Sequence, residues 1–275
     1  MQDKVNSESP LVVLAAAAHP DDVEFCMAGT LLRLGELGAK LHIWNLASGS
    51  CGSNELDVQA IRILRQQEAE QSARIADARL HPPLVDDFEL IYQTDLLRRV
   101  AAVLRGLRPQ VMLIPSPEDY MEDHQNACRL LVSAAFVRGM RNFQTFPPLE
   151  PIDGEMTLYH AMPHGLRDGL RRPVRPQLFV DTTPVIARKQ QMLEAHASQR
   201  QWLERSQGTD CFIETMLEQS RELGRLSGRF EHAEGWRRHN HLGFCAEHAD
   251  PLSELLGASC VLDELFEHDQ RRGEP

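Results

Sequence analysis

The sequence lacks a long apolar run, a basic leader and any C-x-x-C pair. No uncharged stretch approaches the roughly 18 residues of a membrane-spanning helix, and the opening "MQDKVNSESP" has neither the basic start nor the apolar centre of a signal peptide. We therefore expect a cytoplasmic protein with no membrane partner. The six cysteines lie far apart, which favours reduced, structural thiols over a disulfide framework or a zinc ribbon.

Positive charge is also in deficit. The chain has 29 Lys and Arg against 40 Asp and Glu, a formal net charge of -11. A nucleic-acid-binding surface normally shows a basic excess, so nucleic acid is excluded as the main partner. With 42% hydrophobic and 25% charged residues, the composition is that of a soluble globular protein.

Strand-like and helix-like segments alternate from residue 11 to about 180. The expected strands are "LVVLAAAA", "KLHIWNLAS", "PPLV", "VMLIPS", "TLYHAM" and "PQLFVDT", and the expected helices span about 25–37, 54–78, 94–107 and 123–138. Repeated βα units of this length predict an α/β fold with a Rossmann-like, mostly parallel sheet and helices on both faces.

The C-terminal part follows a different pattern. Apolar residues recur at helical spacing in "VIARKQQMLEAHASQRQWLERS" and "CFIETMLEQSRELGRL", whereas "RFEHAEGWRRHNHLGFCAEHADPL" has no clear period. We expect the last stretch to be irregular structure over the sheet edge or at a subunit contact. No low-complexity linker intervenes, so we interpret 1–275 as one domain with a core of about 11–200 and a helical and irregular extension of about 201–275.

A polar cluster follows the first expected strand. In "AAAAHPDDVEF", His19 and Asp22 are three residues apart at the turn into a helix, where both side chains can point to one side. An imidazole and a carboxylate so placed form half of a divalent-metal site. Asp21, between them, stands where a base for metal-bound water is needed.

The third ligand is expected at the end of a neighbouring strand. In "VMLIPSPEDYMEDHQNACRLL", a strand and a polar loop precede His124 at a helix start, and this loop can face the first one across a switch point of the sheet. A structural interpretation competes, because a histidine after a strand is often a hydrogen-bonded cap and paired aspartates cap helices well. The two loops together favour a site.

These motifs resemble those of the PIG-L/LmbE-like family of zinc-dependent N-acetylglucosaminyl deacetylases. "AHPDD" followed by Glu24, and "DH" opening a later helix, carry the resemblance. It continues through "LASGSCGSN", "RQQEAEQSA", "RPQVMLIPS" and "RKQQMLEAHASQ", and covers about 11–199. The resemblance implies the same α/β fold and a homo-oligomer, and a small N-acetylated sugar or conjugate as the binding partner.

The family pattern also implies roles for individual residues. It makes His19, Asp22 and His124 the metal ligands and Asp21 the general base, with Zn²⁺ as the metal and Fe²⁺ or another divalent ion as alternatives. The substrate-binding or supporting candidates are Arg65, Asp87, Tyr120, Asp123 and His164.

One position departs from the pattern. Where the family commonly reads H-P-D-H, this chain reads Met121-Glu122-Asp123-His124, so the first histidine is missing. Tyr120, His160 and His164 are candidates to replace it as donors to an oxyanion, although packing or backbone hydrogen bonds explain each of them more simply. His196, His232, His239, His241 and His248 fit no zinc signature and are expected in surface, interface or supporting positions.

The predicted function is a metal-dependent hydrolase that removes an N-acetyl group from an amino sugar. One alternative has the same fold but hydrolyses a different bond: an amidase acting on a thiol conjugate or an antibiotic-like amide. Another is a catalytically lapsed protein that binds metal or sugar. The two-His-one-carboxylate set also resembles that of non-haem iron oxygenases, which Asp21 and the α/β setting disfavour.

Overall fold

The computed structural model describes residues 10–207, 212–263 and 266. Within them the strands form an eight-stranded sheet in the order β3-β2-β1-β4-β5-β7-β6-β8. The strands are β1 (Val12–Ala17), β2 (Lys40–Asn45), β3 (Arg79–His81), β4 (Val111–Ile114), β5 (Thr157–Ala161), β6 (Leu178–Asp181), β7 (Ala233–Arg238) and β8 (Cys260–Leu262). The α/β class and the mostly parallel sheet are confirmed.

Helices connect and follow the strands. They are α1 (Asp22–Cys26), α2 (Ala28–Glu36), α3 (Val58–Ile75), α4 (Thr94–Leu107), α5 (Glu122–Val137), α6 (Ile186–Glu194), α7 (Ala197–Gln207), α8 (Phe212–Ser227) and α9 (Pro251–Leu256). Short 3-10 turns lie at His164–Leu166, Thr183–Val185 and Gly257–Ser259. No described helix is both long and apolar enough to cross a membrane.

The parallel half of the sheet sets the position of the site. β1 pairs in parallel with β2 on one side and with β4 on the other, and the chain leaves β1 and β4 in opposite directions across the sheet. This is a topological switch point, where the loops after the two strands separate and leave a crevice. The polar clusters after β1 and β4 both end at this crevice.

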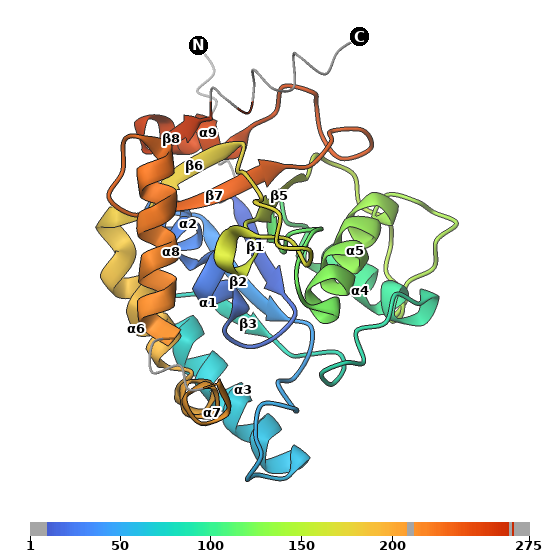
Figure 1. The fold of residues 1–275 in the computed structure, drawn as a ribbon. Coiled ribbons are helices and arrows are strands. Elements are labelled where there is room, and N and C mark those ends of the chain that lie inside the picture. The colour runs from blue at the N-terminus through green and yellow to red at the C-terminus, as the bar shows by residue number, and fades with distance from the viewer. Residues whose placement is uncertain (1–9, 208–211, 264–265, 267–275) are drawn as a thin grey trace.

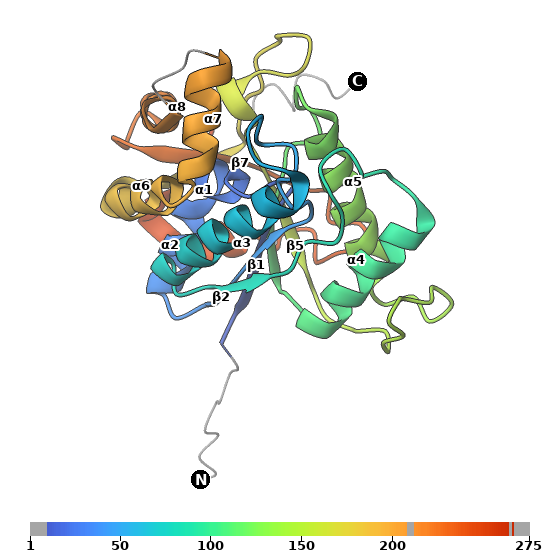
Figure 2. The same cartoon turned by 90° about the horizontal axis from the view of Figure 1, so that it is seen from below.

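Helices cover both faces of the sheet, as predicted. α2, α3 and α6 lie on one side, and α4 and α5 lie on the other (Figures 1 and 2). Each side has its own apolar core, with Leu31 of α2 and Val13 of β1 in one and Leu131 of α5 and Leu14 of β1 in the other. Neighbouring β1 residues thus face opposite cores, and a strand buried on both faces is apolar throughout.

Two expectations about strands were wrong. "PPLV" was expected as a strand, but β3 ends at His81, immediately before Pro82 and Pro83, because proline cannot donate to a ladder. The stretch expected to be irregular contains β7, which lies inside the sheet between β5 and β6 and runs antiparallel to both. The polar residues of β7 broke the apolar pattern by which a buried strand is recognised. Glu234 is only 2% exposed and is tolerated there because it has hydrogen-bond partners inside the protein.

Helix boundaries differ in two further places. The helix expected near 25–37 starts earlier and divides at Met27 into α1 and α2, and the pattern over 185–206 divides into α6 and α7 at Ala195 and His196. β8 was not predicted. Of the six cysteines, Cys211 lies outside the described residues, while Cys128 is buried as predicted and Cys51 is exposed.

Candidate active site

The turn after β1 has an unusual backbone. Asp21, the residue just before α1, has φ 103°, in the left-handed region that residues other than glycine rarely adopt, although Asp tolerates it better than most. The backbone N–H of His19 donates to Oδ2 of Asp22 at 2.8 Å and holds the turn closed. His19 and Asp21 are both buried at this point.

His124 reaches the same place from the first turn of α5. Its Nε2 lies 3.3 Å from Oδ1 of Asp22, and Nδ1 of His19 lies 3.5 Å from Oδ2 of Asp22. One ligand atom from each of His19, Asp22 and His124 lies within 4.8 Å of the others. The structure therefore brings the three predicted ligands together, as expected where two neighbouring parallel strands end.

The ring nitrogens that face away from this group also have carboxylate partners. His19 Nε2 donates to Oδ2 of Asp123 at 3.0 Å, and His124 Nδ1 donates to Oδ1 of Asp119 at 2.9 Å. Metal-binding histidines usually have such a carboxylate behind them, which fixes the ring and the tautomer. Asp119 was missed in the sequence, because a lone acid five residues before a histidine has no recognisable spacing.

The charges in this cluster stabilise one another. Burial lowers the pKa of His19, but hydrogen bonds to Asp123 and Asp22 outweigh it and raise that pKa to about 9. Burial also opposes protonation of His124, while Asp22 and Asp119 raise its pKa to about 11. Burial acts to raise the pKa of Asp22, but His124 and His19 hold it well below its ordinary value. The cluster is a concentrated negative site that favours bound positive charge.

Asp21 has a different environment. Burial raises its pKa to about 6, against the opposing charge of Arg65, whose Nη2 lies 3.1 Å from Oδ2 of Asp21. The same guanidinium donates to the carbonyl of Pro20 at 2.5 Å and, through Nη1, to Oε1 of Gln199 at 2.6 Å. A carboxylate with a pKa near neutrality beside a metal-ligand set is suited to proton transfer.

Asp87 and Asp123 organise the loops around the site. The Asp87 carboxylate accepts the backbone N–H groups of Gly49 (2.7 Å) and Cys51 (2.8 Å). Asp123 accepts the N–H of Phe88 at 2.7 Å in addition to the His19 ring. Both carboxylates are therefore engaged with the protein.

A cavity of about 490 Å³ lies over these residues. Eight of the nine predicted site residues line it: His19, Asp21, Asp22, Arg65, Asp87, Tyr120, His124 and His164; Asp123 does not. Met121 lines it as well and places a thioether where the family pattern has an imidazole. Tyr120 is 61% exposed at the cavity, so packing under the loop does not explain it.

The other histidines lie apart from the ligand group. His160 is buried and bonded to the Pro115 carbonyl (3.0 Å) and to His239 (2.8 Å), which confirms the simpler explanation for it. His196 is fully buried with Nε2 3.3 Å from Oε1 of Glu24, which places it in a supporting position behind α1. In the part of the chain that the structure describes, no second group of ligands comes together.

Comparisons with known proteins find relatives in sequence. Residues 14–136 match the model of the PIG-L family, described as GlcNAc-PI de-N-acetylase. The chain is 28% identical to the diacetylchitobiose deacetylase of Thermococcus kodakarensis over 194 residues, which are 68% of this chain and 69% of that protein. It is 26% identical to the 4-oxalmesaconate hydratase of Pseudomonas putida over 231 residues, which are 81% and 86% of the two chains.

Solved structures share the fold. The N,N'-diacetylchitobiose deacetylase from Pyrococcus horikoshii superposes with a TM-score of 0.71 at 22% identity, covering 90% of this chain and 89% of that one. The 4-carboxy-2-hydroxymuconate hydratase GalB from Pseudomonas putida KT2440 superposes with a TM-score of 0.68 at 24% identity, covering 83% and 95%. The resemblance in the motifs is confirmed: residues 14–136 match the PIG-L family model, and the similar proteins include a deacetylase of this type.

Proposed function

We propose that this protein is a metal-dependent hydrolase that removes an N-acetyl group from an amino-sugar-containing small molecule. The observation that carries the proposal is the meeting of His19, Asp22 and His124 within 4.8 Å of one another, with Asp21 beside them in the cavity. Similarity to a diacetylchitobiose deacetylase supports the substrate class.

The donor atoms fit a divalent metal. Two imidazoles and one carboxylate are the set that Zn²⁺ accepts in hydrolytic sites, with Fe²⁺ as an alternative. Asp119 and Asp123 behind the rings complete the usual arrangement and supply charge to offset the ion. When bound, the ion would polarise the acetyl carbonyl and lower the pKa of a water from about 15.7 to about 7.

The chain's own residues would handle the protons. Asp21 takes a proton from the attacking water on a carboxylate oxygen and returns it to the departing amine nitrogen, so acetate and a free amine are the products. Arg65 holds Asp21 at 3.1 Å and keeps it oriented between the two transfers. Tyr120 and His164 line the same cavity, and in this proposal they donate hydrogen bonds to the substrate's oxygens.

A second candidate is hydration of a carbon–carbon double bond. The match to the 4-oxalmesaconate hydratase covers more of the chain than the match to the deacetylase, which favours it. The charges of the cavity disfavour it: among the described residues that line it, Arg65 is the only one with a permanently charged cation, and Asp21 neutralises it. A polycarboxylate would therefore find no unpaired guanidinium or ammonium group in this described lining, whereas a neutral amide needs none.

The alternatives from the motifs use the same residues. An amidase acting on a thiol conjugate or an antibiotic-like amide needs the same ligands and base, and a lapsed metal- or sugar-binding protein needs the ligands without Asp21. Oxygenase chemistry has no use for a base held by Arg65. Asp21 is therefore the residue that separates these functions.

The test measures metal content together with acetate release. The purified Zn²⁺-loaded protein is incubated with N-acetylated amino sugars, with and without a chelator. We expect chelator-sensitive acetate release that falls by about 10³-fold or more in Asp21→Asn while metal content stays at the wild-type level. Asp95→Asn, an exposed aspartate outside the cavity, is the matched control and should leave both unchanged.

Three other outcomes overturn the proposal. Bound metal with no acetate from any substrate would favour a different bond or a lapsed protein. Hydration of an unsaturated dicarboxylate, followed by loss of its ultraviolet absorbance, would favour the hydratase. Loss of metal and fold in Asp21→Asn would make Asp21 structural.

A further inference from the structure

The cavity holds an unusual share of the chain's aromatic residues. The chain has only ten Phe, three Trp and three Tyr. Five of them line this cavity: Phe25, Phe88, Tyr120, Trp202 and Phe212. The cavity therefore offers a large aromatic surface, of which a single sugar ring would cover only a part.

Four rings form a continuous row that leads to the ligand group. The ring centroid of Phe25 lies 5.6 Å from that of Phe212 and 4.8 Å from that of His164, with interplanar angles of 30° and 35°. Tyr120 continues the row, 6.1 Å from His164 and 5.6 Å from His124. We call Phe212, Phe25, His164 and Tyr120 the aromatic row.

The members of the aromatic row come from separate parts of the chain. Phe25 belongs to α1, Tyr120 to the loop before α5, His164 to the turn after β5 and Phe212 to the start of α8. Core packing explains Phe25, which is 5% exposed, and in part Phe212, which packs against the same cluster, but it does not explain Tyr120, which is 61% exposed. Exposed apolar surface that gathers around a cavity marks a ligand site.

Size and charge indicate what the row would bind. The volume of about 490 Å³ falls within the range of roughly 300–1,000 Å³ typical of pockets for drug-sized ligands. An acetyl group fills a small part of it, so most of the space serves the rest of the substrate. The rings of Phe212, Phe25 and His164 lie at 30° and 35° to one another, which suits stacking with a planar group, whereas Tyr120 meets His164 and His124 edge-on at 63° and 84°. The one arginine of the described lining is paired with Asp21, so it offers no free cation to an anionic group.

We propose that the aromatic row is a subsite for an apolar, ring-bearing aglycone attached to the N-acetylated amino sugar. That the substrate carries an N-acetylated amino sugar is taken from the proposed function, on which this inference rests. It adds that the substrate is a glycoconjugate with a planar apolar group. It also makes Phe212, the member of the aromatic row most distant from His124 in the series of ring contacts, a specificity-determining residue.

The experiment measures binding separately from turnover. Isothermal titration of the Zn²⁺-loaded protein compares phenyl β-glucosaminide with methyl β-glucosaminide, neither of which has an acetyl group to lose. We expect the phenyl compound to bind about tenfold more tightly. The preference should fall to about twofold or less in Phe212→Ala and return in Phe212→Tyr, which restores a ring.

Controls separate this subsite from general effects. Phe146→Ala removes a phenylalanine that is 67% exposed and outside the cavity, and it should keep the preference. Equal affinities, or no measurable binding of either glucosaminide, would overturn the subsite. A preference for an N-phenylacetyl over an N-acetyl sugar, with none between the two glucosaminides, would assign the row to the acyl group and overturn the aglycone.

Catalytic turnover is measured in a separate experiment from binding. Acetate release from methyl N-acetyl-β-glucosaminide tests the proposed function without any aglycone ring. If that release occurs and the phenyl preference is absent, the hydrolase stands and the subsite is wrong. If the phenyl preference occurs without acetate release from any sugar, the subsite stands and the hydrolase is wrong.

Discussion

His124 Nε2 lies 3.3 Å from Oδ1 of Asp22 and so joins the loop after β4 to the loop after β1. The other nitrogen of the ring donates to Asp119, and His19 has the same relation to Asp123. Each imidazole is thus held between two carboxylates, one in the ligand group and one behind it. The orientation of the proposed metal site depends on both.

Replacing Asp119 by asparagine tests the carboxylate behind His124. The amide keeps the hydrogen bond to Nδ1 but loses the charge, so we expect metal affinity to fall about 10- to 100-fold. Competition with a chromogenic chelator measures this affinity. Asp95→Asn, exposed and remote from the cavity, serves as the control, and unchanged affinity in Asp119→Asn would show that the charge has no part in metal binding.

Metal binding should release protons. The pKa values of about 9 for His19 and about 11 for His124 mean that both rings are protonated at pH 7 without metal, and a ligand imidazole must lose that proton. We expect about two protons released per ion at pH 7, and an apparent affinity that rises with pH. Titration calorimetry in buffers of different ionisation enthalpy counts the protons, and a value near zero would contradict this prediction.

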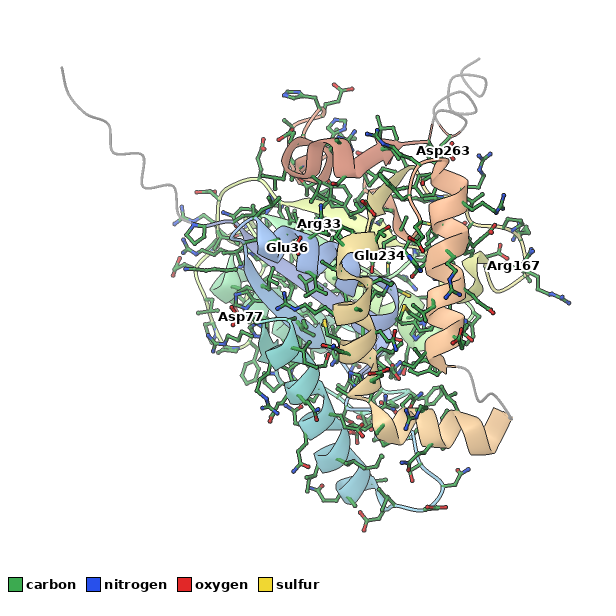
Figure 3. The ribbon with its side chains drawn as sticks, turned by 90° about the vertical axis from the view of Figure 1, so that its left-hand side faces the viewer. Arg33, Glu36, Asp77, Arg167, Glu234 and Asp263 are labelled. Atoms are coloured by element: carbon green, nitrogen blue, oxygen red, sulfur yellow. The ribbon has the colours of Figure 1, made fainter. Side chains whose placement is uncertain are left out.

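The buried pair Lys189–Glu234 should matter for stability. Its Nζ–Oε1 distance is 2.7 Å, both side chains are almost completely buried, and Glu234 lies beneath α6 (Figure 3). Glu234 also accepts the N–H groups of Gly29 and Thr30 at the start of α2. Lys189→Met leaves this charge without its cation, so we expect a loss of about 3–5 kcal/mol in the free energy of unfolding.

Urea denaturation measures that loss. The matched control is Arg225→Met, which breaks the exposed pair with Glu222 on α8 and should leave stability unchanged. The double variant Lys189→Met/Glu234→Gln should recover part of the loss, because no unpaired charge stays buried. A Lys189→Met protein as stable as the wild type would refute a structural role for the pair.

His160 should make the fold sensitive to acid. Burial lowers its pKa from 6.5 to about 4, and the nearby His239 and Arg237 lower it further, although the hydrogen bond that Nδ1 donates to the Pro115 carbonyl acts to raise it. The unfolded state therefore binds a proton that the folded state excludes. Stability is complete above pH 6.5 and falls progressively as the pH drops towards 4, by up to about 3 kcal/mol from this residue.

Urea denaturation at pH 7.5, 5.5 and 4.5 provides the measurement. His160→Gln removes the titrating group, so its stability should decline less steeply with acid than that of the wild type. His248→Gln, with a histidine in the exposed segment before α9, should retain the wild-type slope. Parallel curves for wild type and His160→Gln would contradict the prediction.

Features that depend on neighbours along the chain were predictable from the sequence. The apolar run of β1 is buried on both faces, α4 spans Thr94–Leu107 as its pattern predicted, and "HPDD" forms a turn at the end of a strand. The rule that parallel strands end at one edge of a sheet extended this to His124. Local periodicity and connection rules were sufficient here, because each acts over a few residues or a single βα unit.

Features that depend on partners far away in the sequence became visible only in the folded protein. β7 looked irregular because its Glu234 and arginines break the apolar pattern, and Glu234 is tolerated inside only through Lys189 and two backbone N–H groups far away in the sequence. Asp119 and the aromatic row had no spacing signature for the same reason. The free energy of a buried charge or a ring contact is set by the groups that surround it, and folding alone brings those groups together.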